Sequence, residues 1–340
     1  MARDLIGSAG RLVRQSRNWM YLIITCILFV TVVAVILYWR RSPAASQAET
    51  GYSQPSVIGQ AAPPLAVDTQ PYRDTATMAP EPNVTSGPDA ANIIAESVVL
   101  VTSYPDKVIE ARDKLNAALQ LPMNQQQQKF VKEQLSKLAD KWLFGTSVYR
   151  GDTLCETYTV KPGELLSTIA ERFKVPHEIL MQINNIRRAE AIQAGQSIKV
   201  IKGPFHTTVY RSAFTMDLYL QNTFVRSFNV GIGKAGRETP TGLWRVKFNG
   251  KLISPPWTDP DTGRTYKVSD PDYPLGSRWI SLEGIEGQAK GRTGFAIHGT
   301  KEPEQIGTAA SRGCIRLHNG DAVLVYNLLV PGYSQVRVAE

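Results

Sequence analysis

Cysteine and histidine are scarce in this sequence, which contains three cysteines and four histidines among 340 residues. Cys26 lies within a long apolar run, so only Cys155 and Cys314 remain as a pair that invites a disulfide interpretation. A single disulfide bond in a chain of this length is not the disulfide framework of a small secreted domain. The chain must therefore fold around hydrophobic cores, and its length allows two or three small domains.

A strong charge of one sign is also lacking once the N-terminus is set aside. The net charge is +8, but residues 1–41 hold six Arg and one Asp, or +5, which leaves +3 for the remainder. The remainder is thus only mildly basic. This charge does not imply a nucleic-acid partner, although it allows an anionic cell-wall polymer.

Charges are absent from residues 20–38, a run of 19 residues that predicts a single transmembrane helix. At about 1.5 Å per residue the run crosses roughly 30 Å of hydrocarbon, and Trp19 and Trp39 stand at its two ends. Four arginines within residues 1–19 place that basic segment in the cytoplasm. A cleaved signal peptide is the alternative, but its apolar core is usually shorter.

Two segments without candidate chemistry follow. Residues 42–88 hold eight of the 21 prolines and predict a disordered tether, because this composition buries too little apolar surface. Residues 89–145 repeat apolar side chains at helical spacing, among them Phe130, Leu135 and Trp142. They predict a small helical hairpin or three-helix unit that serves as a spacer or binds a protein partner.

Residues 156–202 show a compact β-α-α-β pattern. The segments "ETYTV" and "QSIKVI" predict short strands, and "PGELLSTIAERF" places Leu165, Ile169 and Phe173 on one helical face. The string "YTVKPGELLSTIAERFKVPHEILMQINN", with "IQAGQSIKV" after it, resembles a LysM module over its full length. That resemblance implies binding to N-acetylglucosamine-containing glycans such as peptidoglycan. A spacer that keeps only the fold is the alternative.

Residues 204–338 break into short alternating segments separated by Gly, Pro and Asn, which predicts a mostly-β sandwich or barrel. The "GIGKAG" at 231–236 fits the G-x-G-x-x-G spacing of dinucleotide-binding loops. That fingerprint needs a helix that opens at the glycines, whereas Pro240 and Gly242 follow closely and break one. We therefore predict a turn between two strands.

The densest chemistry lies in "FAIHGTKEPEQIGTAASRGCIRLH", where His298 and His318 bracket Cys314. Three interpretations compete: a metal site, a buried structural thiol, and a nucleophile with its base. A structural zinc needs four ligands, and no fourth is evident. The "SRG" before the thiol is a polar turn that suits an exposed thiol better than a core residue. A neighbouring imidazole lowers the pKa of a thiol, which favours the nucleophile, with His298 as base and His318 as a cap or a second candidate base.

The same segment is similar to an L,D-transpeptidase catalytic domain of the YkuD type, through "IHGT", a spacing of 16 residues from His298 to Cys314, and "SRGCIRL". The pieces "GIGK", "TPTG" and "YPLGSRWISL" agree with it. The resemblance implies that Cys314 attacks a tetrapeptide stem of peptidoglycan. It implies that His298 moves the proton and that Gly299 orients the ring. No metal and no organic cofactor is needed.

The resemblance also implies roles for the residues around the thiol. The backbone amides of Arg312, Gly313 and Cys314 would form an oxyanion hole. The expected substrate contacts are Arg316, Ser311 and Tyr273.

The sequence thus predicts a multidomain protein with a membrane helix, a helical unit, a LysM module and a mostly-β catalytic domain. It is expected in the bacterial inner membrane as a single-pass protein, N-terminus inside, with a periplasmic catalytic part. The expected partners are peptidoglycan glycans and stem peptides, and the expected product is a 3→3 cross-link. Water as the acceptor would make an L,D-carboxypeptidase, and a lipoprotein lysine a wall-anchoring transpeptidase. A non-catalytic LysM scaffold is the alternative from another class.

Overall fold

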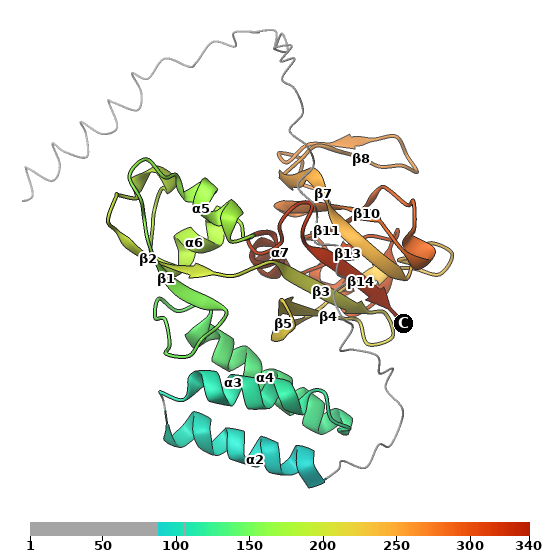
Figure 1. Ribbon diagram of the computed structural model, residues 1–340. Helices are drawn as coiled ribbons and strands as arrows, with labels where there is room; N and C mark the ends of the chain where they lie inside the picture. The colour runs from blue at the N-terminus through green and yellow to red at the C-terminus, as the bar shows by residue number, and fades with distance from the viewer. Residues whose placement is uncertain (1–87, 105) are drawn as a thin grey trace, which may run out of the picture. The chain divides into compact units, whose positions relative to one another are not determined.

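A computed structural model describes residues 88–104 and 106–340, which all belong to one compact unit, 68–340 (Figure 1). The predicted cytoplasmic segment 1–19, the membrane helix 20–38 and all but the last residue of the tether 42–88 lie outside the described residues. Within the described part of the chain, no helix combines the length and the apolar character needed to cross a membrane.

The first module consists of helices α2 (Pro88–Ser103), α3 (Val108–Ala118) and α4 (Gln125–Trp142) (Figure 1). Asn124 begins α4 with a capping box, because its side chain accepts from the Gln127 amide and the Gln127 side chain accepts from the Asn124 amide. One face of α4 is buried, including Leu135 and Trp142. Phe130, predicted on that face, is instead 38% exposed, since the adjacent Val131 takes the core position.

The second module is the predicted β-α-α-β unit. Strands β1 (Cys155–Thr159) and β2 (Ser197–Ile201) pair antiparallel, and helices α5 (Leu166–Arg172) and α6 (His177–Ile183) lie between them in sequence. The core includes Ile169, Ile179 and Ile183. Leu165, predicted on the buried face of the first helix, is 62% exposed because it precedes α5 as its extended N-cap residue, and Leu166 is buried in its place.

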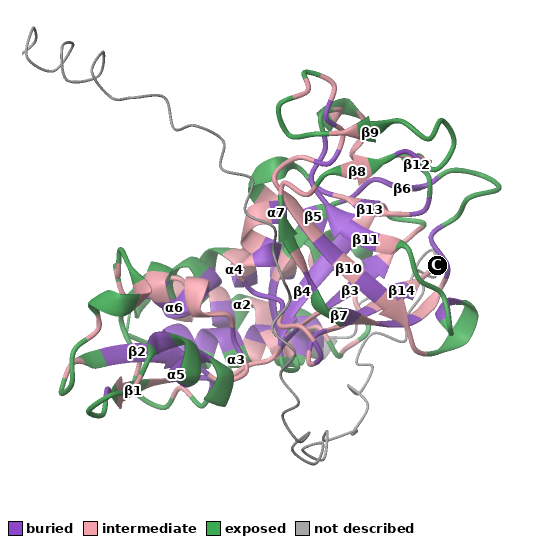
Figure 2. Cartoon of the chain, turned by 90° about the horizontal axis from the view of Figure 1, so that it is seen from above, coloured by how far each residue is buried: buried purple, intermediate pink, exposed green. Residues whose placement is uncertain are grey.

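The third module is built on an eight-stranded sheet with the order β13-β11-β10-β7-β14-β3-β4-β5. In chain order its strands are β3 (Phe205–Tyr210), β4 (Thr215–Leu220), β5 (Thr223–Asn229), β7 (Gly242–Ile253), β10 (Arg278–Gly284), β11 (Phe295–His298), β13 (Ile315–Arg316) and β14 (Gln335–Ala339). The interior of the module is apolar and buried (Figure 2), with Phe205, Trp244 and Val336 fully enclosed. The prediction of a mostly-β fold for residues 204–338 is confirmed.

Three smaller elements complete this module. Strand β6 (Ile232–Gly233) pairs with β12 (Ala309–Ser311), and β8 (Trp257–Thr258) pairs with β9 (Thr265–Tyr266) to form a hairpin. Helix α7 (Asn319–Tyr326) packs beside β10 and β11. The "GIGKAG" segment contains strand β6 and a turn after it, so no helix opens at its glycines, as predicted.

The helical module covers β5, the edge strand of the large sheet. Asn116 of α3 accepts a hydrogen bond from the Phe224 amide at 2.8 Å. Lys132 of α4 places its Nζ 2.6 Å from the carboxylate of Asp217, which is fully buried. An uncovered edge strand would present unpaired backbone groups, so the module protects this edge of the sheet. A protein partner for this module stays a prediction.

A buried polar joint connects the helical module to the second module. Lys199 of β2 donates to the carbonyl oxygens of Trp142, Gly145 and Ser147 at 2.6 to 2.8 Å. These carbonyls lie at and just after the end of α4, where the helix leaves acceptors unpaired. Cys155, 1% exposed, places its Sγ 4.0 Å from the Trp142 carbonyl. Both cysteines of the described chain are free thiols.

Candidate active site

Strand pairing brings the predicted base into a row of side chains on one face of the sheet. Trp279 of β10 lies opposite His298 of β11, and His298 lies beside Arg316 of β13. Directly paired residues of neighbouring strands point to the same face. The rings of Trp279 and His298 stack, with centroids 5.3 Å apart and planes 18° apart. This stacking fixes the plane of the imidazole.

The His298 ring is also fixed by a hydrogen bond. Its Nδ1 lies 2.6 Å from the carbonyl oxygen of Gly299. Because a carbonyl only accepts, Nδ1 carries the proton and Nε2 keeps its lone pair. Burial lowers the pKa of His298 to about 4, although the bond to Gly299 opposes this effect. The ring is therefore neutral at neutral pH, and Nε2 is able to take a proton.

Helix α7 clamps the loop that supplies this carbonyl. Asn319, its first residue, accepts from the Thr300 amide at 3.0 Å and donates to the Thr300 carbonyl at 2.9 Å. Gly299 is tightly enclosed, because an added Cβ would lie 2.2 Å from Asn319 Oδ1. Gly299, the predicted orienting residue, thus has no room for a side chain. The clamped loop holds its carbonyl oxygen toward the His298 ring.

The predicted nucleophile sits in a tight turn between β12 and β13. Gly313 has a φ of +115°, and an added Cβ would lie 2.7 Å from the Phe295 ring, so the turn requires glycine. Ser311 Oγ donates to the Cys314 carbonyl at 2.6 Å and accepts from the Gly313 amide at 3.1 Å. Thr239 Oγ1 donates to the Gly313 carbonyl at 2.8 Å. These bonds hold the backbone on both sides of the thiol.

The turn changes two of the predicted roles. The Gly313 amide is bonded to Ser311 Oγ, so it is not directed at a developing oxyanion as predicted. The amides of Arg312 and Cys314 stay as predicted donors. Ser311 borders the pocket described below but is 1% exposed, and both hydrogen bonds of its hydroxyl belong to the turn. Ser311 therefore positions the nucleophile and is not placed to bind substrate.

The Cys314 thiol is protonated in this arrangement. Its Sγ lies 4.0 Å from the Gly294 carbonyl, and within residues 106–340 no hydrogen bond joins it to the His298 ring. Burial raises the pKa of the thiol to about 11, against the opposing effects of the Ala296 amide and the Arg316 charge. The expected lowering of the thiol pKa by a neighbouring imidazole is not found, because a neutral ring supplies no positive charge.

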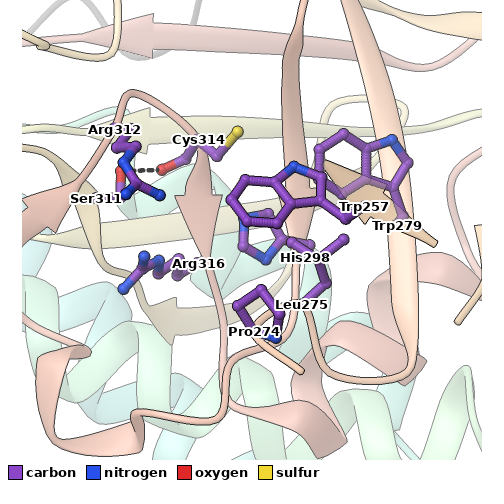
Figure 3. A pocket seen from close by; sticks show the side chains of 9 residues that line it. All are labelled: Trp257, Pro274, Leu275, Trp279, His298, Ser311, Arg312, Cys314 and Arg316. Atoms are coloured by element: carbon purple, nitrogen blue, oxygen red, sulfur yellow. Dashed lines mark hydrogen bonds between the residues drawn. The ribbon is translucent and has the colours of Figure 1, made fainter. Parts of the chain in front are cut away.

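Cys314 and His298 border the same pocket, whose volume is about 60 Å³ (Figure 3). The lining residues are Trp257, Pro274, Leu275, Trp279, His298, Ser311, Arg312, Cys314 and Arg316. In Figure 3 the two tryptophans lie on the side of His298, and the two arginines lie on the other side. Apolar and cationic walls together suit a substrate with apolar and anionic groups. The pocket is open to solvent, so a longer peptide can extend beyond the nine lining residues.

The β8–β9 hairpin forms one wall of the pocket through Trp257. It is joined to the nucleophile turn by Arg312, whose Nη2 lies 3.1 Å from Asp259 Oδ2 and whose Nε lies 2.8 Å from Asp261 Oδ2. The same guanidinium lies 6.0 Å from the centroid of the Trp257 ring. A movement of this hairpin therefore changes both a pocket wall and the surroundings of Arg312.

Two predicted substrate contacts have other partners. Arg316 borders the pocket, but its Nη1 donates to Gln305 at 2.6 Å and lies 3.2 Å from Glu302, so this group holds a loop. Tyr273 does not border the pocket. Its hydroxyl donates to the Pro255 carbonyl at 2.6 Å. Tyr273 thus supports the base of the β8–β9 hairpin.

The fold also shows the surroundings of the remaining candidate and adds residues that the sequence did not indicate. His318 precedes α7 but makes no capping bond through its side chain, and it does not border the pocket. The sequence analysis missed Trp257, Thr239 and Asn319. Thr239 lies in the quoted "TPTG", and Asn319 directly follows His318, the last residue of the quoted catalytic segment. Among the residues that the structure describes, no group of His, Cys, Asp or Glu is arranged to hold a metal ion.

Comparisons with known proteins assign two of the modules. Residues 204–338 match the family model YkuD, the L,D-transpeptidase catalytic domain. Residues 158–200 match the model of the LysM domain. The two resemblances inferred from the motifs are confirmed.

Individual relatives agree with this assignment. The putative L,D-transpeptidase YkuD of Bacillus subtilis strain 168 is 32% identical over 189 residues, which cover 54% of this chain and 98% of that protein. The probable L,D-transpeptidase ErfK/SrfK of Escherichia coli K12 is 35% identical over 127 residues, which cover 34% of this chain and 37% of that protein. A crystal structure of an L,D-transpeptidase from Mycobacterium tuberculosis H37Rv aligns at 18% identity with a TM-score of 0.32, over 44% of this chain and 64% of that one. The assignment rests on the sequence matches.

Proposed function

This chain belongs to the YkuD-type L,D-transpeptidase family, and on that premise we propose that it cross-links the stem peptides of peptidoglycan. The observation that carries the proposal is the pocket shared by Cys314 and His298, with His298 Nδ1 held by the Gly299 carbonyl. A thiol beside a base whose second nitrogen is free of its proton is what nucleophilic acyl transfer requires.

The first step forms a thioester. Sγ of Cys314 bonds to the carbonyl carbon that joins an L-centre to the terminal D-Ala, and Nε2 of His298 takes the thiol proton. With pKa values of about 11 for the thiol and about 4 for the imidazole, this proton transfer accompanies the attack and does not precede it. When the C–N bond breaks, His298 gives the proton to the leaving amine, and D-Ala departs. The amides of Arg312 and Cys314 stabilise the oxyanion.

The second step consumes the thioester. A side-chain amine of diaminopimelate in a neighbouring stem attacks the acyl carbon, which gives a 3→3 cross-link. His298 takes the proton that the amine loses and returns it to the departing sulfur, so the neutral thiol and the neutral imidazole are restored. The reaction needs no other reactant.

The remaining segments deliver the enzyme to an insoluble substrate. We assign glycan binding to the LysM module, membrane anchoring to residues 20–38 and a periplasmic position to the catalytic part. The support is the LysM match, the 19 uncharged residues and the arginines before them. Holding the enzyme at the wall raises the effective concentration of its substrate.

Mass spectrometry of the full chain incubated with a disaccharide-tetrapeptide tests the proposal. We expect loss of D-Ala and a cross-linked dimer, both absent with Cys314→Ala and both present with Cys155→Ala. Loss of D-Ala without a dimer would indicate a carboxypeptidase or an acceptor on another protein. Unchanged substrate with folded, reduced protein would contradict the proposal and leave a wall-binding scaffold.

A further inference from the structure

Asp261 bridges two arginines, of which Arg312 borders the pocket. Its Oδ1 lies 2.9 Å from Arg237 Nη1, and its Oδ2 lies 2.8 Å from Arg312 Nε. Arg237 follows β6 and Arg312 follows β12, and the pairing of Ser311 with Gly233 fixes these two strands side by side. The two arginines thus follow strands that lie side by side, and their guanidiniums converge on one carboxylate.

The carboxylate of Asp261 differs from that of its neighbour Asp259. Asp259 is 6% exposed, and its Oδ1 accepts from the amides of Asp261 and Thr262, so it is built into the hairpin turn. The side chain of Asp261 is 38% exposed, and its charge is paired only with Arg237 and Arg312 among the described residues. Exposed ion pairs are weak, and one carboxylate readily replaces another on a guanidinium.

The position of the arginines relates this carboxylate to the reaction. Arg312 borders the pocket and stands two residues before Cys314. Arg316, the pocket's other arginine, is 16% exposed at its side chain and holds Glu302 and Gln305. Of the two, Arg312 has the partner that exchanges more easily.

We propose that Arg237 and Arg312 form a subsite for a carboxylate of the peptide stem, and that Asp261 occupies this subsite until the substrate arrives. The inference rests on the proposed function, because the stem peptide supplies the carboxylate. Displacing Asp261 removes one of the two ion pairs that tie the β8–β9 hairpin to the nucleophile turn. The hairpin carries Trp257, so the same event loosens one wall of the pocket.

Alkylation of Cys314 by charged and neutral reagents tests the subsite without requiring turnover. The full chain is treated with iodoacetate or iodoacetamide, and with 4-bromobutyrate or its amide, and modification of Cys314 is followed by peptide mass spectrometry. Asp261→Asn should raise the rate ratio of carboxylate to amide reagent by about 1.5-fold to 5-fold for at least one chain length, the range of an exposed ion pair. Adding Arg312→Gln or Arg237→Gln to Asp261→Asn should return the ratio toward its original value.

Asp272→Asn is the matched control. The side chain of Asp272 is also 38% exposed and pairs with Arg264 of the β8–β9 hairpin. Asp272→Asn therefore removes an equal charge that is not paired with Arg312. An equal rise of the rate ratio in Asp261→Asn and Asp272→Asn would show that the effect comes from the net charge, and it would overturn the proposed subsite. Equal acceleration of both reagents by Asp261→Asn would show only a looser hairpin and would also overturn it. Because alkylation needs only the thiol, failure of the proposed transpeptidation would appear separately, as unchanged stem peptide.

Discussion

The two described cysteines occupy chemically similar but functionally different places. Burial raises the pKa of Cys155 to about 12 and that of Cys314 to about 11. Each Sγ lies 4.0 Å from a backbone carbonyl, that of Trp142 or that of Gly294. Cys155, however, is enclosed at a joint between modules, whereas Cys314 borders a pocket with a neutral histidine.

This difference teaches that the resting acidity of a thiol does not mark the nucleophile here. Both thiols are protonated at neutral pH, so the distinction lies in what surrounds them. Near Cys155 the charged neighbours are Asp152, Lys199 and Arg112, and the thiol is enclosed with them at the joint. Near Cys314 lies the neutral base His298, and both residues border an opening that a reagent can enter.

The largest expected effect comes from removing each thiol in turn. Cys314→Ala should reduce release of D-Ala by more than about 10³-fold, because it removes the atom that forms the thioester. Cys155→Ala should leave the release rate within about twofold and lower the free energy of unfolding by about 1 to 2 kcal/mol, as expected for a small buried side chain. Product analysis and urea unfolding of both variants check this. An inactive but folded Cys155→Ala protein would refute the comparison.

The base is the next way to sharpen the comparison. His298→Gln should lower kcat/KM by about 10² to 10⁴-fold, the usual contribution of a general base. In the wild type kcat/KM should fall only as the pH drops through about 4, since His298 must be neutral. A rate profile with an acid limb near 6.5 would show that the ring is not buried as described.

The same histidine makes the catalytic sheet acid-sensitive. The pKa of His298 in the folded chain is below its unfolded value of about 6.5, so the unfolded state binds more protons between pH 6.5 and about 4. The contribution of the neutral ring to the free energy of unfolding is fully present above pH 6.5. It falls by about 1.4 kcal/mol per pH unit as the pH drops through this range. His206, whose pKa burial also lowers to about 4, is a matched control. His206→Gln should reduce this pH slope as His298→Gln does, yet leave alkylation of Cys314 unchanged.

A smaller effect should follow from loosening the loop behind the base. Asn319→Ala removes both hydrogen bonds to Thr300 and opens space beside Gly299. We expect kcat/KM to fall by about tenfold, because His298 is no longer held in one orientation. Asn319→Asp keeps the acceptor and should lose less. Equal activity in all three proteins would show that α7 does not position the base.

The smallest effect on chemistry should come from the joint around Cys155. Lys199→Met leaves the carbonyls of Trp142, Gly145 and Ser147 without their donor, which should lower the free energy of unfolding by about 1 to 3 kcal/mol. Alkylation of Cys314 in the folded variant should proceed at the wild-type rate. A changed rate would mean that the two thiol sites are coupled.

Much of the fold and of the candidate site could be predicted from the sequence. The parts that could not be predicted have a common cause. Local periodicity predicted the β-α-α-β unit and the helical module, and the spacing of "IHGT" and "SRGC" indicated the pair His298 and Cys314. Local pattern erred at Leu165, which precedes its helix, and at Phe130, whose core position is taken by Val131. It could not predict Trp257 at the pocket or the Gly313 amide bonded to Ser311, because these depend on how distant strands meet and on side-chain rotamers.

The place of β14 in the sheet has a consequence for biosynthesis. This strand pairs parallel with β3 and antiparallel with β7, so it joins the strands that carry the active site to the rest of the sheet. The ribosome must therefore deliver residue 339 before the sheet can form as one unit. In an enzyme proposed to act outside the membrane, a nascent chain without this strand leaves the two parts of its large sheet unjoined.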